Sequence, residues 1–484
     1  MQMTLKDFWK KNPALLLGLS FYFAALFAFG YPLALLLFLP ICLPVVFCSL
    51  KWCACCLIVF LFFWIYIHFW YQIPEQGCVG KATITISSIH SKESLFSKKG
   101  WLYRGRIKKL VTDTITLRPR LPYTLFIQTD KPQDHSKYEV MATVYHDHGR
   151  HLYLKPKVGQ SWSPISEQIS IAKWRFLSKD WVKKKIHQNI SSNKAAIVLA
   201  ALATGDLNDK VTIKEFRDLG LAHLMAISGF HFSLLAFFFH LFLRLFVPYP
   251  FCYFFLLLLL TLYFFFIGAS PSIERAYLMI TIFLFGQLIA RRAYPLNSLG
   301  IALMISIARD PLVIFQLGFQ FSYLATVALL IFMSPIKKSF EFLIPSRSFN
   351  EVIASPIWKR HVFVLLSILR DLLTLDVAVH LVIIPFSLSV FHTFSFSGLL
   401  FNLFFPFLMT LSLVLLLFGP FLMSINSYYT HLLLTLTEFK PPLLGKSIWI
   451  KEFPPCFLGI YFLILFLGGI LLQTDQKNGS CFNN

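Results

Sequence analysis

Polar residues that could do chemistry interrupt an otherwise apolar run at about residues 219–247. His223, Ser228, Gly229 and His231 occur there among Leu, Ala, Met and Phe. Inside a membrane such groups are costly unless they face a cavity or each other, and Gly229 allows the backbone to unwind or to pack closely. The cluster predicts a lining element of an aqueous path. The alternative is hydrogen bonding between helices of a packed bundle.

The same cluster contains a nucleophile and a base. Ser228 and His231 could in principle form a hydrolase dyad. However, no second glycine completes a GxSxG motif, and no acidic residue close in the sequence would orient His231. We therefore expect no catalytic residues and no enzymatic activity, and keep an intramembrane serine hydrolase as an alternative.

Three later segments also place polar residues beside helix breakers. They surround Pro271, Gly318 and the pair Gly398 and Pro406. Broken helices of this style line the pathways of transport proteins, so their recurrence favours a conduit over a simple membrane anchor. Besides the first cluster, the candidate path-lining residues are Asp206, Glu274, Arg275, Asp310, Gln320, Ser322 and Asn402.

No cofactor or metal is expected. The stretch HDHGRH at 146–151 resembles a di-metal hydrolase loop, but Arg150 occupies the position of the required Asp. Gly445, Lys446 and Ser447 resemble the end of a phosphate-binding loop, but Lys440 stands where its first Gly is needed. Any transport would need energy from a partner or a gradient.

The composition indicates which elements must position these residues. Of the 484 residues, 57% are hydrophobic and only 14% are charged, whereas soluble domains carry about 25% charged residues. The sequence predicts an all-α polytopic membrane protein with about 10–12 transmembrane or re-entrant helices. The net charge of +21 favours an anionic partner, either lipid headgroups or nucleic acid.

One long polar segment interrupts the apolar runs. Residues 75–194 carry 22 Lys and Arg against 9 Asp and Glu, a net charge of +13. Short alternating runs separated by turn residues predict a small β-barrel or sandwich there. The expected organisation is an anchor of three helices at 1–74, a basic β domain at 75–170, an interfacial helix at 171–194, a membrane domain at 195–473 and a polar tail at 474–484.

The interfacial helix is predicted to be amphipathic and basic. Trp174, Leu177, Trp181 and Ile186 can line one face, with Lys179 and residues 183–185 around the other. An ordinary domain helix is the alternative. The distribution of Lys and Arg over the short loops predicts that the N-terminus and the loop around 337–360 are inside and that 75–194 is outside.

Several stretches together resemble one family. GLAHLMAISGFHFSLL, GASPSIERAYLM, DPLVIFQLGFQFSYLA and IIPFSLSVF occur in the order found in the membrane core of ComEC, the bacterial DNA-internalisation competence family. The resemblance covers roughly 195–440. It implies an OB-like fold for the polar domain, and a channel in the bacterial cytoplasmic (inner) membrane. That channel would carry single-stranded DNA inward during natural transformation.

The resemblance also implies partners and one departure. Beyond single-stranded DNA and membrane lipids, we expect a separate DNA-receptor protein, a cytoplasmic motor or single-stranded-DNA-binding protein, and a second copy of the chain. Longer members of the family end in a metallo-β-lactamase-like domain. This sequence ends at 484 without an intact HxHxDH motif, so we expect a short form in which another protein degrades the second strand.

The polar domain supplies the candidate DNA contacts. A basic barrel with exposed aromatic rings offers charge and stacking surfaces to single strands. The main alternative is an exporter or transporter of another polymer or small molecule. Such a protein would not need a basic domain of this kind. The expected contacts are Arg104, Arg106, Lys108, Lys109, Trp101 and Tyr103, with Phe126 and Tyr153 as further stacking residues.

Overall fold

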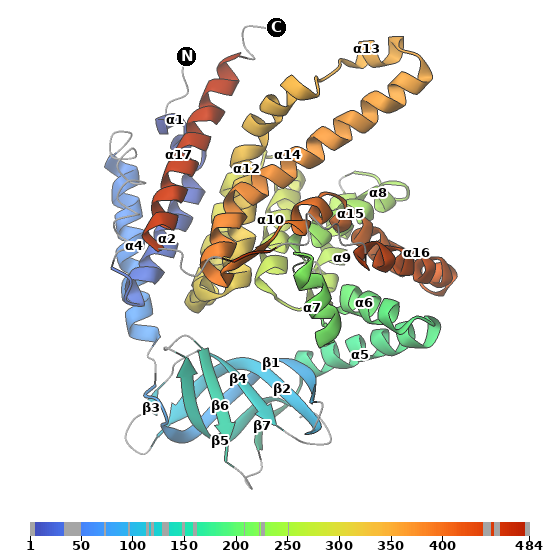
Figure 1. Cartoon of the computed structure of the whole chain (residues 1–484). Coiled ribbons are helices and arrows are strands. Elements are labelled where there is room, and N and C mark those ends of the chain that lie inside the picture. The colour runs from blue at the N-terminus through green and yellow to red at the C-terminus, as the bar shows by residue number, and fades with distance from the viewer. Residues whose placement is uncertain are drawn as a thin grey trace.

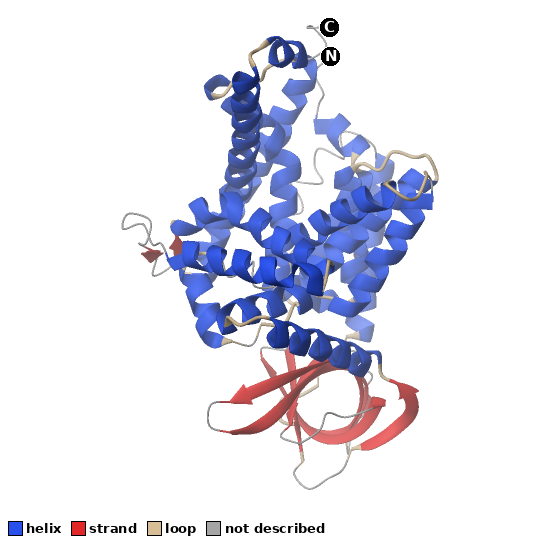
Figure 2. Ribbon diagram, turned by 90° about the vertical axis from the view of Figure 1, so that its right-hand side faces the viewer, coloured by secondary structure: helices blue, strands red, loops and turns tan. Residues whose placement is uncertain are grey.

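A computed structural model shows a β-barrel at one end of a helical body (Figures 1 and 2). Both chain termini and α13 (Phe349–Ala354) lie at the end opposite the barrel (Figure 1). The structure describes residues 5–32, 50–71, 74–94, 97–112, 116–117, 121–127, 135–147, 151–157, 162–207, 209–221, 223, 228–249, 251–438, 447–449 and 455–479.

Within the described residues, five strands close a barrel. The order is β1-β2-β4-β6-β5, and β5 pairs back onto β1. All of these pairs are antiparallel except β4 with β6. The short β3 pairs with β2, and β7 pairs with β5, both antiparallel. The strands are β1 (Val79–Ser94), β2 (Ser97–Val111), β3 (Thr116–Leu117), β4 (Pro122–Ile127), β5 (His135–Asp147), β6 (His151–Pro156) and β7 (Ser163–Ile169).

The alternation along β2 decides which side chains fill the barrel. Tyr103 and Ile107 point inward and are fully buried, because alternate residues of a strand face the same side. A register shift between Thr83 and Ile84 of β1 leaves one extra residue on β2. This bulge breaks the alternation, so Lys108 and Lys109 are both exposed.

A helix connects the barrel to the helical body. It is α5 (Ile171–Asn189), which begins at Ser170, whose side chain accepts a hydrogen bond from the Lys173 N–H. Trp174 and Trp181 are exposed as predicted. The placement of Ile186 on the same face was wrong, because Ile186 is buried against α6 (Asn193–Thr204) in a shared apolar cluster.

The other helices form the body around several apolar clusters. α10 contacts α8, α9, α11 and α12. The remaining elements are α1 (Leu5–Lys11), α2 (Pro13–Ala28), α4 (Leu50–Trp70), α7 (Lys210–Asp218), α8 (Gly229–Arg244), α9 (Phe251–Ile267), α10 (Pro271–Leu288), α11 (Pro295–Arg309), η2 (Pro311–Phe315), α12 (Leu317–Leu343), α14 (Ile357–Phe391), β8 (Thr393–Ser395), α15 (Ser397–Leu417), α16 (Pro420–Glu438), β9 (Ser447–Trp449) and α17 (Pro455–Gly479).

Three of the described helices are long and apolar enough to cross a membrane. They are Lys51–Phe69, Leu317–Leu343 and Ser397–Leu417, and shorter apolar helices accompany them. Large apolar side chains are exposed on many helices, which suits lipid rather than water. The predicted helical protein with an inserted barrel is therefore confirmed in outline, whereas the expected 10–12 spanning or re-entrant helices stay a prediction.

The apolar runs divide into helices partly as expected. The break at Asp310 and Pro311 separates α11 from α12, as the proline predicts. One helix, α14, continues through the apolar stretches on both sides of Asp376. Its charged residue Asp376 is accommodated by His380 one turn later, with the carboxylate oxygen 3.1 Å from Nδ1.

Candidate functional site

The start of α8 holds the most polar part of the predicted path. Ser228 caps the helix and accepts a hydrogen bond from the His231 N–H, while His231 Nδ1 accepts one from the Ser228 N–H, each at 3.3 Å. This reciprocal cap satisfies two backbone donors that the first helical turn leaves without partners. Capping explains why Ser228 and His231 lie three residues apart.

The geometry favours a cap over a hydrolase dyad. Ser228 Oγ lies 2.9 Å from His231 Nδ1, and Nδ1 accepts a backbone hydrogen bond, which places the ring proton on Nε2. A triad would need a carboxylate at that Nε2 atom. Within the described residues, His231 Nε2 is buried and has no hydrogen-bond partner, so no orienting acid is present there.

A hydroxyl pair joins α8, α10 and α12 at this point. The Gly229 N–H donates to Ser272 Oγ at 2.9 Å, and Ser322 Oγ donates to Ser272 Oγ at 3.2 Å. Arg275 Nε in turn donates to Ser322 Oγ at 2.9 Å. Three predicted residues therefore meet in one cluster. We call Gly229, Ser272, Arg275 and Ser322 the core cluster.

Gly229 is needed because the guanidinium passes close to its backbone. A Cβ at this position would lie 2.4 Å from Arg275 Nη2 and 3.1 Å from the Ser272 carbonyl oxygen, so a larger residue would have to displace the guanidinium. Besides Ser322, the described partner of Arg275 is the Met279 sulfur at 3.7 Å. Among the described residues no carboxylate pairs with Arg275, so its charge is met only by neutral groups.

Glu274 and Asp310 lie elsewhere and are used in ion pairs. Glu274 is buried and pairs with Arg309 at the end of α11. Asp310 caps η2 by accepting the Leu312 N–H at 3.2 Å, and its Oδ2 lies 3.9 Å from Nη2 of Arg106 in the barrel. Asp310 thus links the helical body to β2.

The remaining predicted path residues are not joined to the core cluster by a described hydrogen bond. Gln320 Nε2 donates to the Ile314 carbonyl at 2.8 Å. Asn402 lies on α15, and its Oδ1 is buried without a partner among the described residues. His223 is exposed between α7 and α8. Of these, Gln320 supports the turn into α12.

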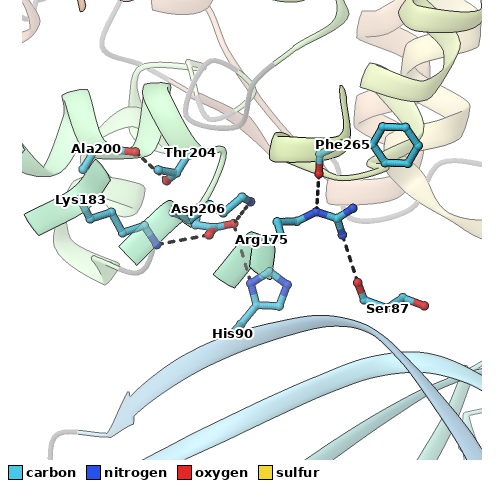
Figure 3. Close-up of polar contacts among 9 residues, drawn as sticks. Ser87, His90, Arg175, Lys183, Ala200, Thr204, Asp206 and Phe265 are labelled. Carbon is cyan, nitrogen blue, oxygen red and sulfur yellow. Dashed lines mark hydrogen bonds and ion pairs between the residues drawn. The ribbon is translucent and has the colours of Figure 1, made fainter. Parts of the chain in front are cut away.

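Asp206 lies at the base of the barrel rather than beside α8. It follows Gly205, whose φ of +73° ends α6 in a left-handed turn. Its Oδ1 lies 3.0 Å from Lys179 Nζ, and its Oδ2 lies 3.2 Å from Lys183 Nζ; both lysines belong to α5 (Figure 3). His90 Nδ1 of β1 lies 3.8 Å away. We call these four residues the joint.

Burial and the attraction between opposite charges act against each other on the pKa values of the joint residues. Burial acts to raise the pKa of the Asp206 carboxyl, but Lys179, Lys183 and His90 outweigh it, so that pKa lies below its ordinary value. Burial lowers the pKa of the Lys179 ammonium, against the pull of Asp206. Burial also lowers the pKa of His90, against the pull of Asp206.

Arg175 of α5 adds a second set of contacts beside the joint. Its Nη1 donates to the Ser87 carbonyl of β1 at 3.1 Å, and its Nε donates to the Phe265 carbonyl of α9 at 2.7 Å (Figure 3). One side chain thus connects the barrel, α5 and the helical body. Together with the Arg106–Asp310 pair, these contacts fix the barrel against the helices.

The predicted stacking role of Trp101 and Tyr103 was wrong. Their exposed fractions are 8% and 0%, because both side chains lie on the inward side of β2. Trp101 packs its edge against Phe176 of α5 at 5.4 Å between ring centroids, and Tyr103 packs against Trp162 at 5.4 Å. These rings build the barrel core and cannot stack on a base at the surface.

The outer face of the barrel carries a different set of residues. Cross-strand pairing puts Arg104 beside Thr124, Thr124 beside Tyr153 and Tyr153 beside Tyr145. Tyr145 and Tyr153 are 41% and 46% exposed, and Arg104 is also exposed. We call these four residues the outer row. Phe126 is exposed on the same strand as Thr124.

The basic residues of β2 are of two kinds, three that are exposed and one that is paired with the helical body. Arg104, Lys108 and Lys109 are exposed, and no carboxylate of the described residues pairs with them. Arg106 is half-buried and paired with Asp310. On β2, Arg104 lies between Arg106 and Leu102, which is opposite His90 of the joint.

Sequence reasoning missed Ser272 and the partners of Asp206. Ser272 sits in the quoted SPS stretch, and a serine just after a helix-starting proline was an available signal. The contact of His90 with Asp206 joins residues far apart in the chain, so no spacing could reveal it. No group of three or more metal ligands occurs among the described residues; positions 148–150 of the HDHGRH stretch lie outside them.

Comparisons with known proteins give the chain its family. The family model described as "Competence protein" matches residues 203–475, more than half of the chain. ComE operon protein 3 of Bacillus subtilis (strain 168) is 28% identical over 138 residues, which are 28% of this chain and 18% of that protein. The match therefore spans under a fifth of the relative's length. No solved structure matches the chain. With its core cluster inside the matched region, the chain belongs to the competence protein family, that is, the ComEC family.

Proposed function

We propose that this protein carries one strand of transforming DNA across the bacterial cytoplasmic membrane during natural competence. The observation that carries the proposal is the attachment of a basic barrel to a helical body of the competence family by the joint and by the Arg106–Asp310 pair. Such attachment would deliver a strand bound on the barrel directly to the membrane domain.

The barrel would be the DNA-binding element on the outside. The closed five-stranded barrel with one parallel pair supports our assignment of an OB fold, a class of domain that binds oligonucleotides on its strand faces. The outer row supplies what such a surface needs, because Arg104 can contact phosphates and the two tyrosines can stack on bases. Arg104, at one end of the outer row, also lies close to the joint, where the helical body begins.

Basic residues at the end opposite the barrel support one orientation in the membrane. α13 lies at the end away from the barrel (Figure 1), and the last turns of α12, the link to α13 and the start of α14 carry Lys337, Lys338, Arg347, Lys359 and Arg360. Cytoplasmic loops are enriched in Lys and Arg, so the barrel would be outside. A cysteine replacing the exposed Lys155 should react with an impermeant thiol reagent in intact cells; protection of that cysteine would contradict the orientation.

Further partners follow from the same proposal. Trp174 and Trp181 of α5 are exposed beside basic residues and would lie at the lipid interface. A separate DNA receptor would present DNA to the barrel, and a cytoplasmic motor or single-stranded-DNA-binding protein would take up the emerging strand. A second copy of the chain is a further partner we propose.

Deletion of the gene tests the function. Cells lacking the protein should bind labelled DNA at the surface but fail to bring the label into the cytoplasm, and the wild-type gene should restore entry. An exporter of another substrate would leave entry unchanged. Normal cytoplasmic entry of DNA in the deletion strain would contradict the proposal.

A further inference from the structure

A half-open cavity of about 240 Å³ adjoins the core cluster. Arg275 lines it together with Ser233 of α8 and Ser298 of α11, and most of the remaining wall is apolar, including Met279 and Phe283. An engineered cavity of roughly 150 Å³ in another protein holds a benzene molecule. This cavity therefore has room for a phosphate group joined to a sugar ring.

The cavity is suited to an anion. Arg275 is held by the Ser322 hydroxyl, and no carboxylate among the described residues neutralises it. α8 and α10 both begin beside the guanidinium, and helix N-termini carry partial positive charge. A cation kept in an apolar region without a counter-ion is costly, so an anionic occupant would stabilise the arrangement.

The other polar groups of the wall can serve the same occupant. Ser233 Oγ donates to the Gly229 carbonyl at 2.8 Å, and Ser298 Oγ donates to the Tyr294 carbonyl at 3.2 Å. Each hydroxyl bonds within its own helix and can rotate to face an anion. The apolar remainder of the wall suits a sugar or base rather than a hydrated free ion.

The cavity extends from the core cluster away from the barrel. α10 begins at the barrel end, because Phe265 near the end of the preceding helix α9 accepts a hydrogen bond from Arg175 beside the joint. The cavity wall continues to Ala293, which lies in the connection between α10 and α11, and to Pro295 at the start of α11. Arg291 and Arg292 are exposed in that connection. The cavity thus leads from the core cluster toward the end of the body that faces away from the barrel.

We propose, on the basis of the proposed function, that this cavity holds one phosphodiester unit of the entering strand, with Arg275 as its anion contact. The strand would pass from the outer row to the core cluster and leave past Arg291 and Arg292. A phospholipid is the competing occupant, and the test below distinguishes it.

Photo-crosslinking in cells tests the proposal. A benzophenone amino acid replaces Phe283 in one variant and Phe285 in a matched control. Both residues lie on α10 with exposed fractions of 48% and 58%, and only Phe283 lines the cavity. Labelled DNA anchored to a bead at one end stalls during entry. We expect a DNA adduct at position 283 and only background at position 285.

Changing Arg275 sharpens the result. In the position-283 variant, Arg275→Gln should lower the DNA adduct yield about tenfold, because a charged contact is lost, and Arg275→Lys should retain most of it. A lipid adduct without DNA at position 283, or equal DNA adducts at both positions, would overturn the proposal. Failure of the proposed function is separable, because DNA would then also fail to crosslink to the same amino acid at Tyr153 of the barrel.

Discussion

The joint and the core cluster differ in how they neutralise their cations. At the joint, Lys179 and Lys183 share the carboxylate of Asp206. In the core cluster, Arg275 meets only the hydroxyl of Ser322 and a weak sulfur contact among the described residues. The joint therefore uses its charge to hold two parts of the protein together. The core cluster leaves its charge available to a ligand that is not part of the chain.

The largest expected effect concerns the joint. Asp206→Asn leaves the buried Lys179 and the half-buried Lys183 without a counter-charge, which should destabilise the protein by about 3 kcal/mol. Thermal unfolding in detergent and limited proteolysis between barrel and helices would measure the loss. The double variant Asp206→Asn with Lys179→Met should recover much of it. A single variant as stable as the wild type would show that the joint does not hold the barrel.

The core cluster should affect transport instead of stability. Arg275→Gln removes the charge and should reduce cytoplasmic entry of labelled DNA about tenfold, as expected for a lost charged hydrogen bond. Arg275→Lys should retain most of the wild-type entry. The thermal stability of both variants should stay near that of the wild type. A large fall in stability with Arg275→Gln would instead make Arg275 a structural residue like Asp206.

Within the barrel, charge and stacking can be separated by salt. Arg104→Gln in the full chain should flatten the logarithmic salt dependence of oligonucleotide binding by about 0.7, the value for one phosphate contact with a single strand. Tyr153→Ala should weaken binding by about 1–3 kcal/mol without changing that slope. Fluorescence titration at several salt concentrations measures both quantities. Lys81→Gln, which breaks only the pair with Glu139, is the control.

The smallest effect is expected at the cap of α8. Ser228→Ala removes one capping hydrogen bond, at a cost of about 1 kcal/mol, and DNA entry should fall only slightly. Ser228→Leu should be more harmful than Ser228→Thr, because Thr keeps the capping oxygen. If Ser228 were a nucleophile, Ser228→Ala would abolish activity and a serine-directed covalent inhibitor would label the protein.

The sequence predicted the features that depend on local patterns. The apolar runs indicate helices, the alternating runs at 75–170 indicate the barrel, and the proline after Asp310 marks the break between α11 and α12. Arg104 and Lys108 were rightly expected at the surface. The same alternation implies that Trp101 and Tyr103 face inward, opposite to Arg104. Trp101 and Tyr103 were placed wrongly because the aromatic and basic residues of this segment were assumed to share one exposed face.

The contacts across long distances in the chain could not be predicted. Asp206 was assigned to the path with His223 and Ser228 because the three are close in sequence, but its partners come from β1 and α5. Arg106 was assigned to DNA, and its partner Asp310 lies on a distant segment. Ion pairs of this kind depend on how helices and barrel are packed, which spacing along the chain does not determine.

The most direct test of the account couples the charge of the DNA to the charge of Arg275. Donor DNA with a block of neutral methylphosphonate linkages and ordinary donor DNA are compared for cytoplasmic entry, in cells with wild-type protein and with Arg275→Gln at equal membrane abundance. If Arg275 contacts the passing phosphates, the neutral block should reduce entry strongly through the wild type and much less through the variant. Equal fractional losses in both proteins would contradict the account.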